Sequence, residues 1–293
     1  MLIKVADDRT KRLKLLEELQ KVEHLNFPQR DWLRQQLRCL SPGSAKAREA
    51  AHYLDVVFAA SNNHAVLHDL RLEAGGQIAH IDHLVLDQSL TFFLVETKNY
   101  KGSLHIDGRG GFMVEYPGDP ISAIESPLEQ IRSHEAVLKK VLESLGIIEQ
   151  AGTQPNFVHL VMVHPKSMIH RADPKAFDSS MVIKADQFST WHKAYAGKVK
   201  AAEVSTDLLG GSSENSVKVW GEQLKAEHRP VNQLDLPDFM KPVALAEKPK
   251  AAVPQVCAIC GKKLSPKVAK FCADKLIRFN GRLYCYEHQA DKK

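Results

Sequence analysis

Apolar residues recur at intervals of three and four along the first part of the chain, a spacing that predicts helices. The pattern predicts helices over residues 7–40, with an interruption at Pro28, and over residues 45–60. A proline interrupts a helix because it lacks the backbone N–H group and clashes with the preceding turn. The polar run Ser61-Asn62-Asn63-His64 ends the second of these regions.

The pattern then changes to the alternation and short apolar runs that are typical of strands. Strands are predicted over residues 65–72, 77–87 and 90–98, and residues 104–107 and 112–116 are expected to extend the same sheet. Glycine pairs and short polar turns divide these segments, as expected for strands that follow one another closely.

A helix and a buried strand come next. Ser126 can cap the helix, Pro127 suits its first turn and Glu129 completes a capping box. The helix is expected to end at Gly146, and the nearly all-apolar segment 157–164 predicts a strand buried on both faces of a sheet. This order of helices and strands predicts an α/β fold, with a mixed central sheet between two layers of helices.

Composition divides the chain into a larger body and a small C-terminal part. Proline interrupts a stretch rich in Ala, Lys and Val near residue 250, which is typical of a linker. We therefore expect an N-terminal helical segment (1–43), a domain (44–240, core 44–165), a linker (241–256) and a small module (257–293). With no run of roughly 20 apolar residues and no secretory signal, the expected location is the cytoplasm, away from membranes.

The net charge of +5 is small, but it is unevenly distributed. Residues 241–293 hold 12 Lys and Arg residues against 4 Asp and Glu residues, whereas the rest of the chain holds 28 against 31. A polyanionic partner is therefore expected to meet the C-terminal part, and the body is not itself a broad cationic surface.

Two carboxylates and a lysine are placed where a hairpin would bring them together. Glu96 and Lys98 are two residues apart in a strand, so their side chains share one face, and the preceding strand brings Asp82 beside them. Two neighbouring carboxylates repel each other unless a cation joins them, and hard oxygen ligands suit Mg²⁺ or Mn²⁺. A nearby lysine can stabilise charge on a phosphoryl group, so the set suits phosphodiester hydrolysis. The alternative is an ordinary Glu–Lys pair on a solvated strand end.

The two segments that carry this set, GQIAHIDHLVL (76–86) and FLVETKNYKG (93–102), resemble the signature of the nuclease-related domain (NERD) family. That family is part of the PD-(D/E)xK nuclease superfamily. The similarity covers about residues 44–165. It implies a restriction-endonuclease-like α/β/α sandwich with a mixed central sheet and a nucleic-acid phosphodiester as substrate, although such folds can also be kept as binding modules.

The resemblance also implies further site residues. Glu49 matches a glutamate on the helix before the hairpin, and Gln130 matches a polar residue on the helix after the sheet. Asp82, Glu96 and the backbone carbonyl of Thr97 are implied as ligands of Mg²⁺ or Mn²⁺. Family members often have Gly-Glu where this chain has Arg48-Glu49, so the start of that helix could differ. Each of Glu49 and Gln130 could instead be an ordinary helix residue.

Histidines flank Asp82 on both sides. By strand alternation, His83 faces away from the side of Asp82, whereas His80 lies on the same face as Asp82, one step further along the strand. For both we expect packing or surface roles rather than metal ligation.

The C-terminal module has the spacing of a zinc site. Cys257 and Cys260 are separated by two residues, and Cys285 and His288 repeat this spacing 25 residues after Cys260. Two such pairs, separated by a hairpin-sized segment, present four tetrahedral ligands to Zn²⁺ in a zinc-ribbon-like module. Gly261 suits the turn after the first pair, and Asn280-Gly281 is a hairpin signal before the second. So short a segment cannot bury a sufficient core, so a metal would supply the folding free energy.

Two cysteines remain outside this set. Cys272 could replace one of the four ligands, but a single cysteine between two pairs more often packs as a small buried residue, and we assign it that role. Cys39 is most simply a buried helix residue.

Cations and aromatic side chains alternate in the module. They suit phosphate contact and base stacking, or else a solubilising charge over a small apolar core. The residues concerned are Lys262, Lys263, Lys267, Lys270, Lys275, Arg278, Arg282, Phe271, Phe279, Tyr284 and Tyr286.

Together these features favour a divalent-metal-dependent nuclease whose zinc module helps to hold nucleic acid, with DNA favoured over RNA. A non-catalytic nucleic-acid-binding protein and a protein-interaction adaptor docking through the zinc module are the alternatives. The complete Asp82, Glu96 and Lys98 set favours the nuclease.

Overall fold

A computed structural model describes residues 1–40, 44–100, 102–203, 214–240, 255–279 and 282–290. The chain divides into two compact units, residues 1–235 and 236–293. Most of the predicted linker, residues 241–254, and the side chain of Cys39 lie outside the described residues. The finer division into four parts stays a prediction.

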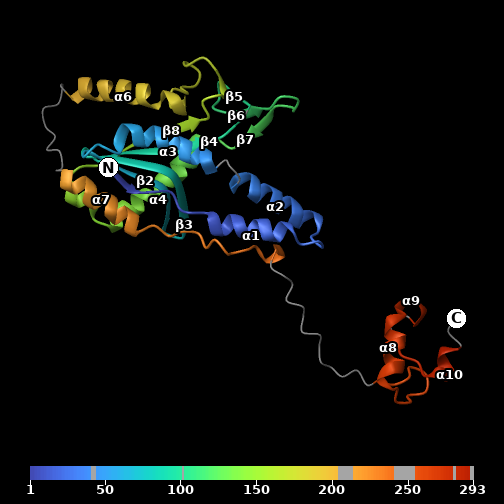
Figure 1. Ribbon diagram of the computed structural model, residues 1–293. Helices are drawn as coiled ribbons and strands as arrows, with labels where there is room; N and C mark the ends of the chain where they lie inside the picture. The colour runs from blue at the N-terminus through green and yellow to red at the C-terminus, as the bar shows by residue number, and fades with distance from the viewer. Residues whose placement is uncertain (41–43, 101, 204–213, 241–254, 280–281, 291–293) are drawn as a thin grey trace. The chain divides into compact units, whose positions relative to one another are not determined.

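A mixed sheet of six strands forms the centre of the first unit (Figure 1). Its strands lie in the order β1 (Leu2–Lys4), β2 (His64–Ala74), β3 (Gln77–Asp87), β4 (Thr91–Lys98), β8 (Asn156–Val163) and β10 (Val182–Lys184). β3 pairs antiparallel with β2 and β4, and the other neighbours are parallel. β4 and β8 lie inside the sheet and are mostly buried, as the apolar run predicted for residues 157–164.

Helices cover both faces of this sheet (Figure 1). Apolar side chains of α4 (Pro127–Ser144) and α7 (Glu214–Ala226) share one core with the sheet, and those of α3 (Ser44–Phe58) and α6 (Phe188–Glu203) share a second. Short helices α5 (Ile147–Ala151) and η1 (Ala185–Gln187) precede β8 and α6. The predicted α/β/α sandwich with a mixed central sheet is confirmed.

Helix α4 begins as its sequence predicts. The Ser126 side chain accepts a hydrogen bond from the backbone N–H of Glu129, and Pro127 occupies the first turn. Its inward face buries Ile131, Leu138 and Leu142 against the sheet. The capped start therefore fixes where residues of the first turns, Gln130 among them, meet the sheet.

The strands after β4 do not extend the central sheet, and this part of the prediction is wrong. β5 (Ser103–Ile106) and β6 (Phe112–Glu115) belong to a separate four-stranded sheet with β7 (Ser122–Ile124) and β9 (Met168–Arg171). The central sheet places β8 beside β4, so the next strands of the chain pair elsewhere. Strand patterns identify strands, but they do not identify which neighbour completes each one.

The N-terminus joins the central sheet through a strand that the hydrophobic pattern does not reveal. β1 contributes Ile3 to the core of the sheet and pairs with β2, although it is three residues long. α1 (Thr10–Gln20) and α2 (Phe27–Leu40) follow as two separate helices, which bury Leu16 and Leu33. A strand of this length carries too little periodicity to be recognised from sequence.

The second unit is small and mostly helical where the structure describes it. It contains the short helix η2 (Asp238–Met240) and the helices α8 (Pro266–Asp274), α9 (Leu276–Phe279) and α10 (Tyr286–Gln289). Cys257, Cys272, Phe279, Tyr284 and Cys285 form its buried cluster. Among the described residues of the chain, no helix combines the length and the apolar content needed to cross a membrane.

Gly102 is required where the chain turns from the central sheet into β5. A Cβ atom added to Gly102 would lie 1.9 Å from the carbonyl oxygen of Glu115, a backbone atom that a rotamer change cannot move. We expect Gly102→Ala to lower the free energy of unfolding by about 1–3 kcal/mol, measured by urea denaturation. Gly197→Ala is the matched control, because an added Cβ there meets nothing within 4 Å in helix α6 and should be neutral or stabilising. Equal stability of the Gly102→Ala variant and the wild type would contradict the assigned packing.

Candidate active site and metal centre

The acidic pair lies at one end of the hairpin formed by β3 and β4. The register pairs His83 with Val95, so Asp82 and Glu96 are the next residues toward that end of the two strands. Glu96 is buried, with 4% of its surface exposed, and Asp82 is half-buried. Asp82 Oδ2 accepts hydrogen bonds from the backbone N–H (2.8 Å) and the hydroxyl (2.7 Å) of Thr97.

Lys98 connects strand β4 to helix α4. Its Nζ donates to Glu96 Oε1 and to Gln130 Oε1, each at 2.8 Å. Gln130 lies on the first turns of α4, which the Ser126 cap positions against the sheet. The structure thus brings together four side chains predicted from sequence, Asp82, Glu96, Lys98 and Gln130, from three elements.

Electrostatics at Glu96 follow from this crowding. Burial and the neighbouring charge of Asp82 raise the pKa of Glu96 to about 7, although the Lys98 ammonium group acts in the opposite direction. A carboxyl group with this pKa is only partly ionised near neutral pH. A bound divalent cation would favour the ionised form of both carboxylates and remove their repulsion.

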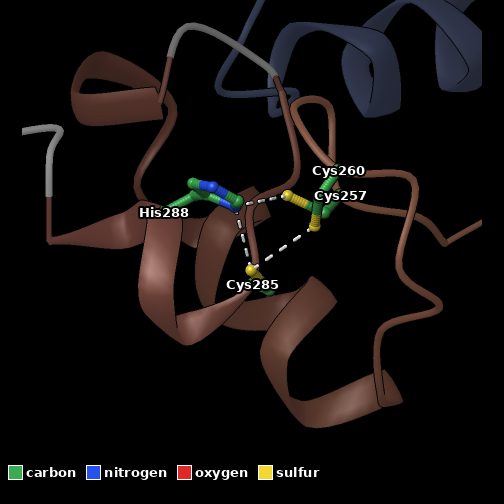
Figure 2. Close-up of side chains that lie close together, drawn as sticks. All are labelled: Cys257, Cys260, Cys285 and His288. Atoms are coloured by element: carbon green, nitrogen blue, oxygen red, sulfur yellow. Dashed lines mark hydrogen bonds between the residues drawn. The ribbon is translucent and has the colours of Figure 1, made fainter.

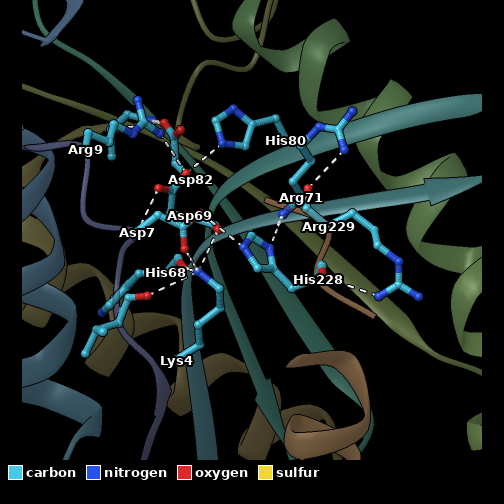
Figure 3. Close-up of polar contacts among 12 residues, drawn as sticks. Lys4, Asp7, Arg9, His68, Asp69, Arg71, His80, Asp82, His228 and Arg229 are labelled. Atoms are coloured by element: carbon cyan, nitrogen blue, oxygen red, sulfur yellow. Dashed lines mark hydrogen bonds and ion pairs between the residues drawn. The ribbon is translucent and has the colours of Figure 1, made fainter. Parts of the chain in front are cut away.

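Figure 3 shows further polar residues near Asp82, among them Asp69, Arg9 and His80. Asp69 on β2 accepts a hydrogen bond from His80 Nε2 at 2.6 Å, and it forms an ion pair with Arg9 at 2.8 Å. The hydrogen bond to Asp69 is the largest cause that raises the pKa of His80, and the charge of Asp82 adds to it. Sequence reasoning missed Asp69 and Arg9. The only signal was a His-Asp pair interrupting the apolar run of β2.

Three further histidines lie near the site without joining the acidic pair. His134 on α4 is mostly buried. Burial lowers its pKa, although the charge of Asp82 acts in the opposite direction. His83 points to the opposite side, where its Nδ1 lies 2.8 Å from His68 Nδ1, and His68 Nε2 contacts Asp55 at 3.1 Å. Burial lowers the pKa of His83 to about 3, so its imidazole is neutral.

Glu49 lies on helix α3, and its side chain is outside the described residues. α3 packs on the face of the sheet opposite to α4. The role assigned to Glu49 therefore stays a prediction.

The mixed six-stranded sheet between layers of helices is consistent with a nuclease-like α/β fold. Residues 42–165 match the family model of the nuclease-related domain, so the chain contains a nuclease-related domain, as its sequence motifs predict. The matched region includes the acidic pair, Lys98 and Gln130, whereas Arg9 and the C-terminal module lie outside it. No curated protein and no solved structure matches the chain.

The second centre is a group of three cysteines and one histidine (Figure 2). The ligand atoms of Cys257, Cys260, Cys285 and His288 all lie within 4.8 Å of one another and could hold a metal ion. Cys260 Sγ lies 3.9 Å from Cys285 Sγ, and His288 Nδ1 lies 3.2 Å from Cys285 Sγ. Tetrahedral Zn–S bonds of about 2.3 Å give sulfur–sulfur separations of about 3.8 Å, so this set fits Zn²⁺.

Local backbone geometry builds each ligand pair. Gly261 has a φ of 68° and closes the turn after the first pair, with its N–H donating to the carbonyl of Cys257. Cys285 caps helix α10, which carries His288 one turn later. The segment between the pairs contains helices α8 and α9, where the sequence suggested a hairpin. The predicted hairpin signal at residues 280–281 lies outside the described residues.

Cys272 lies apart from the metal ligands. It is fully buried on α8, and its Sγ accepts hydrogen bonds from the backbone N–H of Tyr284 (3.4 Å) and from Gln289 Nε2 (3.3 Å). These contacts give the sulfur a packing role inside the module.

The aromatic side chains of the module divide into two groups. Phe279 and Tyr284 belong to its buried cluster, while Phe271 and Tyr286 are exposed. Stacking on a nucleobase is therefore open to the second group, and the first group forms the small core.

The metal centre gives a direct prediction. Metal analysis of the purified chain should find about one zinc per molecule, and Cys257→Ser or His288→Ala should lose it because three ligands hold the ion far more weakly. Cys272→Ser, the matched control, should retain the metal. Loss of zinc from Cys272→Ser together with retention by His288→Ala would contradict the ligand set.

Proposed function

We propose that this protein is a divalent-metal-dependent nuclease that hydrolyses phosphodiester bonds of nucleic acid. The observation that carries the proposal is the position of Lys98, which contacts Glu96 and Gln130 beside Asp82 within the nuclease-related domain. Carboxylates, an amide and an ammonium group in one polar cluster match the needs of phosphoryl transfer better than those of packing.

Asp82 and Glu96 would hold the catalytic Mg²⁺ or Mn²⁺, with the backbone carbonyl of Thr97 as a further ligand. Oxygen donors of this kind suit both ions. The pKa of Glu96 is raised by burial and by the charge of Asp82, and a bound cation would offset both effects. The ion would act as a Lewis acid on the phosphoryl group. Thr97 holds Asp82 in place through two hydrogen bonds, so this ligand would be oriented before the ion binds.

Lys98 would act on the charge that develops during hydrolysis. Glu96 and Gln130 fix its ammonium group by hydrogen bonds from two directions, which reduces the reorganisation needed when a phosphate enters. From this position it can donate to a phosphoryl oxygen or orient a water molecule. Gln130 would act by positioning Lys98, and Glu49 is proposed as a further polar group at the site.

The C-terminal module would bind zinc and assist in holding nucleic acid. Its Lys and Arg residues exceed its acidic residues, while the rest of the chain has a slight excess of acidic residues. Phe271 and Tyr286 are exposed there, and Lys275 lies over the Phe271 ring at 4.7 Å. A cation beside an exposed ring suits a phosphate and its base, and we favour DNA as the substrate.

Substitutions in the cluster test the proposal. Glu96→Ala, Lys98→Ala and Asp82→Asn should each reduce hydrolysis at least about 100-fold, because each group acts on the ion or on the transition-state charge. Lys140→Ala, a solvent-exposed lysine of α4, is the control and should keep full activity. Unchanged turnover of purified, folded Glu96→Ala would refute the assigned site.

Deletion of residues 243–293 tests the role of the module. The truncated chain should bind nucleic acid more weakly and with a flatter salt dependence, because each phosphate contact on a duplex contributes roughly 0.9 to the log–log slope. Turnover at saturating substrate should change little, since Asp82, Glu96 and Lys98 lie in the other unit. If affinity and slope are both unchanged, the module is better explained as an adaptor that binds protein.

A further inference from the structure

Asp69 is a carboxylate that contacts two basic side chains, and both are more exposed than it is. Its side chain is 11% exposed, whereas those of its partners Arg9 and His80 are 44% and 43% exposed. Burial alone would raise the pKa of Asp69, but the hydrogen bond from His80 and the charge of Arg9 hold it well below its usual range. The three residues form a rim whose acidic member lies inside and whose basic members face solvent.

This rim adjoins the candidate active site (Figure 3). His80 is two residues before Asp82 on β3, and strand alternation places both side chains on one face. A strand whose phosphate reaches Asp82 from the side of β2 would pass close to Arg9 and His80.

The loop that carries Arg9 is anchored at several points. Lys4 is buried, and its Nζ donates to the carbonyls of His68 (3.0 Å) and Asp69 (2.9 Å) and to Asp7 Oδ1 (2.8 Å). Asp7 in turn contacts His228 Nε2 at 3.1 Å, and its backbone N–H donates to Asp69 Oδ2. Arg9 then begins helix α1 by accepting the N–H of Leu13. Arg9 is thus held in place, unlike an ordinary surface arginine.

The backbone of Asp69 is itself unusual. Its φ of 55° lies in the left-handed region, where residues other than glycine are uncommon. The Lys4 contact with its carbonyl and the Asp7 contact with its carboxylate support this conformation. Backbone of this kind persists where surrounding contacts require it and is frequent at binding sites.

We propose that Arg9, oriented by Asp69, binds a phosphate of the nucleic-acid strand that enters the Asp82–Glu96 site. The segment before the nuclease-related domain would then contribute directly to substrate binding. The inference rests on the proposed function, because it needs a nucleic acid at the acidic pair. A guanidinium group has five N–H donors in a plane, so it can bind Asp69 along one edge and a phosphate along another.

Salt-dependent binding of a labelled DNA duplex, with no Mg²⁺ or Mn²⁺ added, tests this assignment with the full-length chain. Arg9→Gln should weaken binding about ten-fold and reduce the log–log salt slope by about 0.9, the contribution of one phosphate contact. Arg34→Gln is the matched control, because Arg34 is an exposed arginine of the same N-terminal region paired with Asp31 at 3.5 Å. It should leave affinity and slope unchanged. A merely structural Arg9 would shift the melting temperature without changing the slope, and that result would overturn the inference.

A second measurement avoids any effect of substitution on folding. Arginine modification by phenylglyoxal, mapped by mass spectrometry on the wild-type chain, should be several-fold slower at Arg9 when the duplex is added, and unchanged at Arg34. Equal modification of Arg9 with and without saturating duplex would overturn the inference while leaving the nuclease proposal intact. If the wild-type chain binds no DNA or RNA at all, the proposed function and this inference both fail.

Discussion

The repulsion between two neighbouring carboxylates is the constraint on which the site depends. Asp82 and Glu96 lie directly beyond the His83–Val95 pair of two adjacent strands, and Glu96 is buried, so their charges cannot be separated by solvent. The molecule offsets this cost with Lys98 beside Glu96 and with two Thr97 donors to Asp82. A divalent cation would offset it further, which links the geometry of the hairpin to the chemistry proposed for it.

The rest of the first unit serves to hold this hairpin end in place. β4 lies between β3 and β8 in the centre of the sheet, so the strand that carries Glu96 and Lys98 is supported on both sides. The capped start of α4 positions Gln130, and the loop between β1 and α1 brings Arg9 beside β2. Residues from regions far apart in sequence therefore meet around one short stretch of strand.

Local patterns predicted much of this arrangement. The cap at Ser126 fixed the start of α4, and the alternation of β3 and β4 placed Asp82, Glu96 and Lys98 together. The contacts of Arg9 and Asp69 could not be predicted, because they depend on how a three-residue strand pairs with β2. Helix α8 could have been predicted from the sequence, because Ser265 and Pro266 form the same start signal as Ser126 and Pro127 of α4. The spacing of the cysteines drew attention to a hairpin instead.

Hydrolysis by the wild-type chain with and without divalent metal tests the central claim most directly. Purified protein should be incubated with labelled duplex and single-stranded DNA and RNA in Mg²⁺, in Mn²⁺ and in EDTA. The account predicts cleavage of at least one substrate in Mg²⁺ or Mn²⁺, and none in EDTA, because Asp82 and Glu96 would act through the bound ion. Cleavage that persists at the same rate in EDTA, or no cleavage of any substrate with either metal, would contradict it.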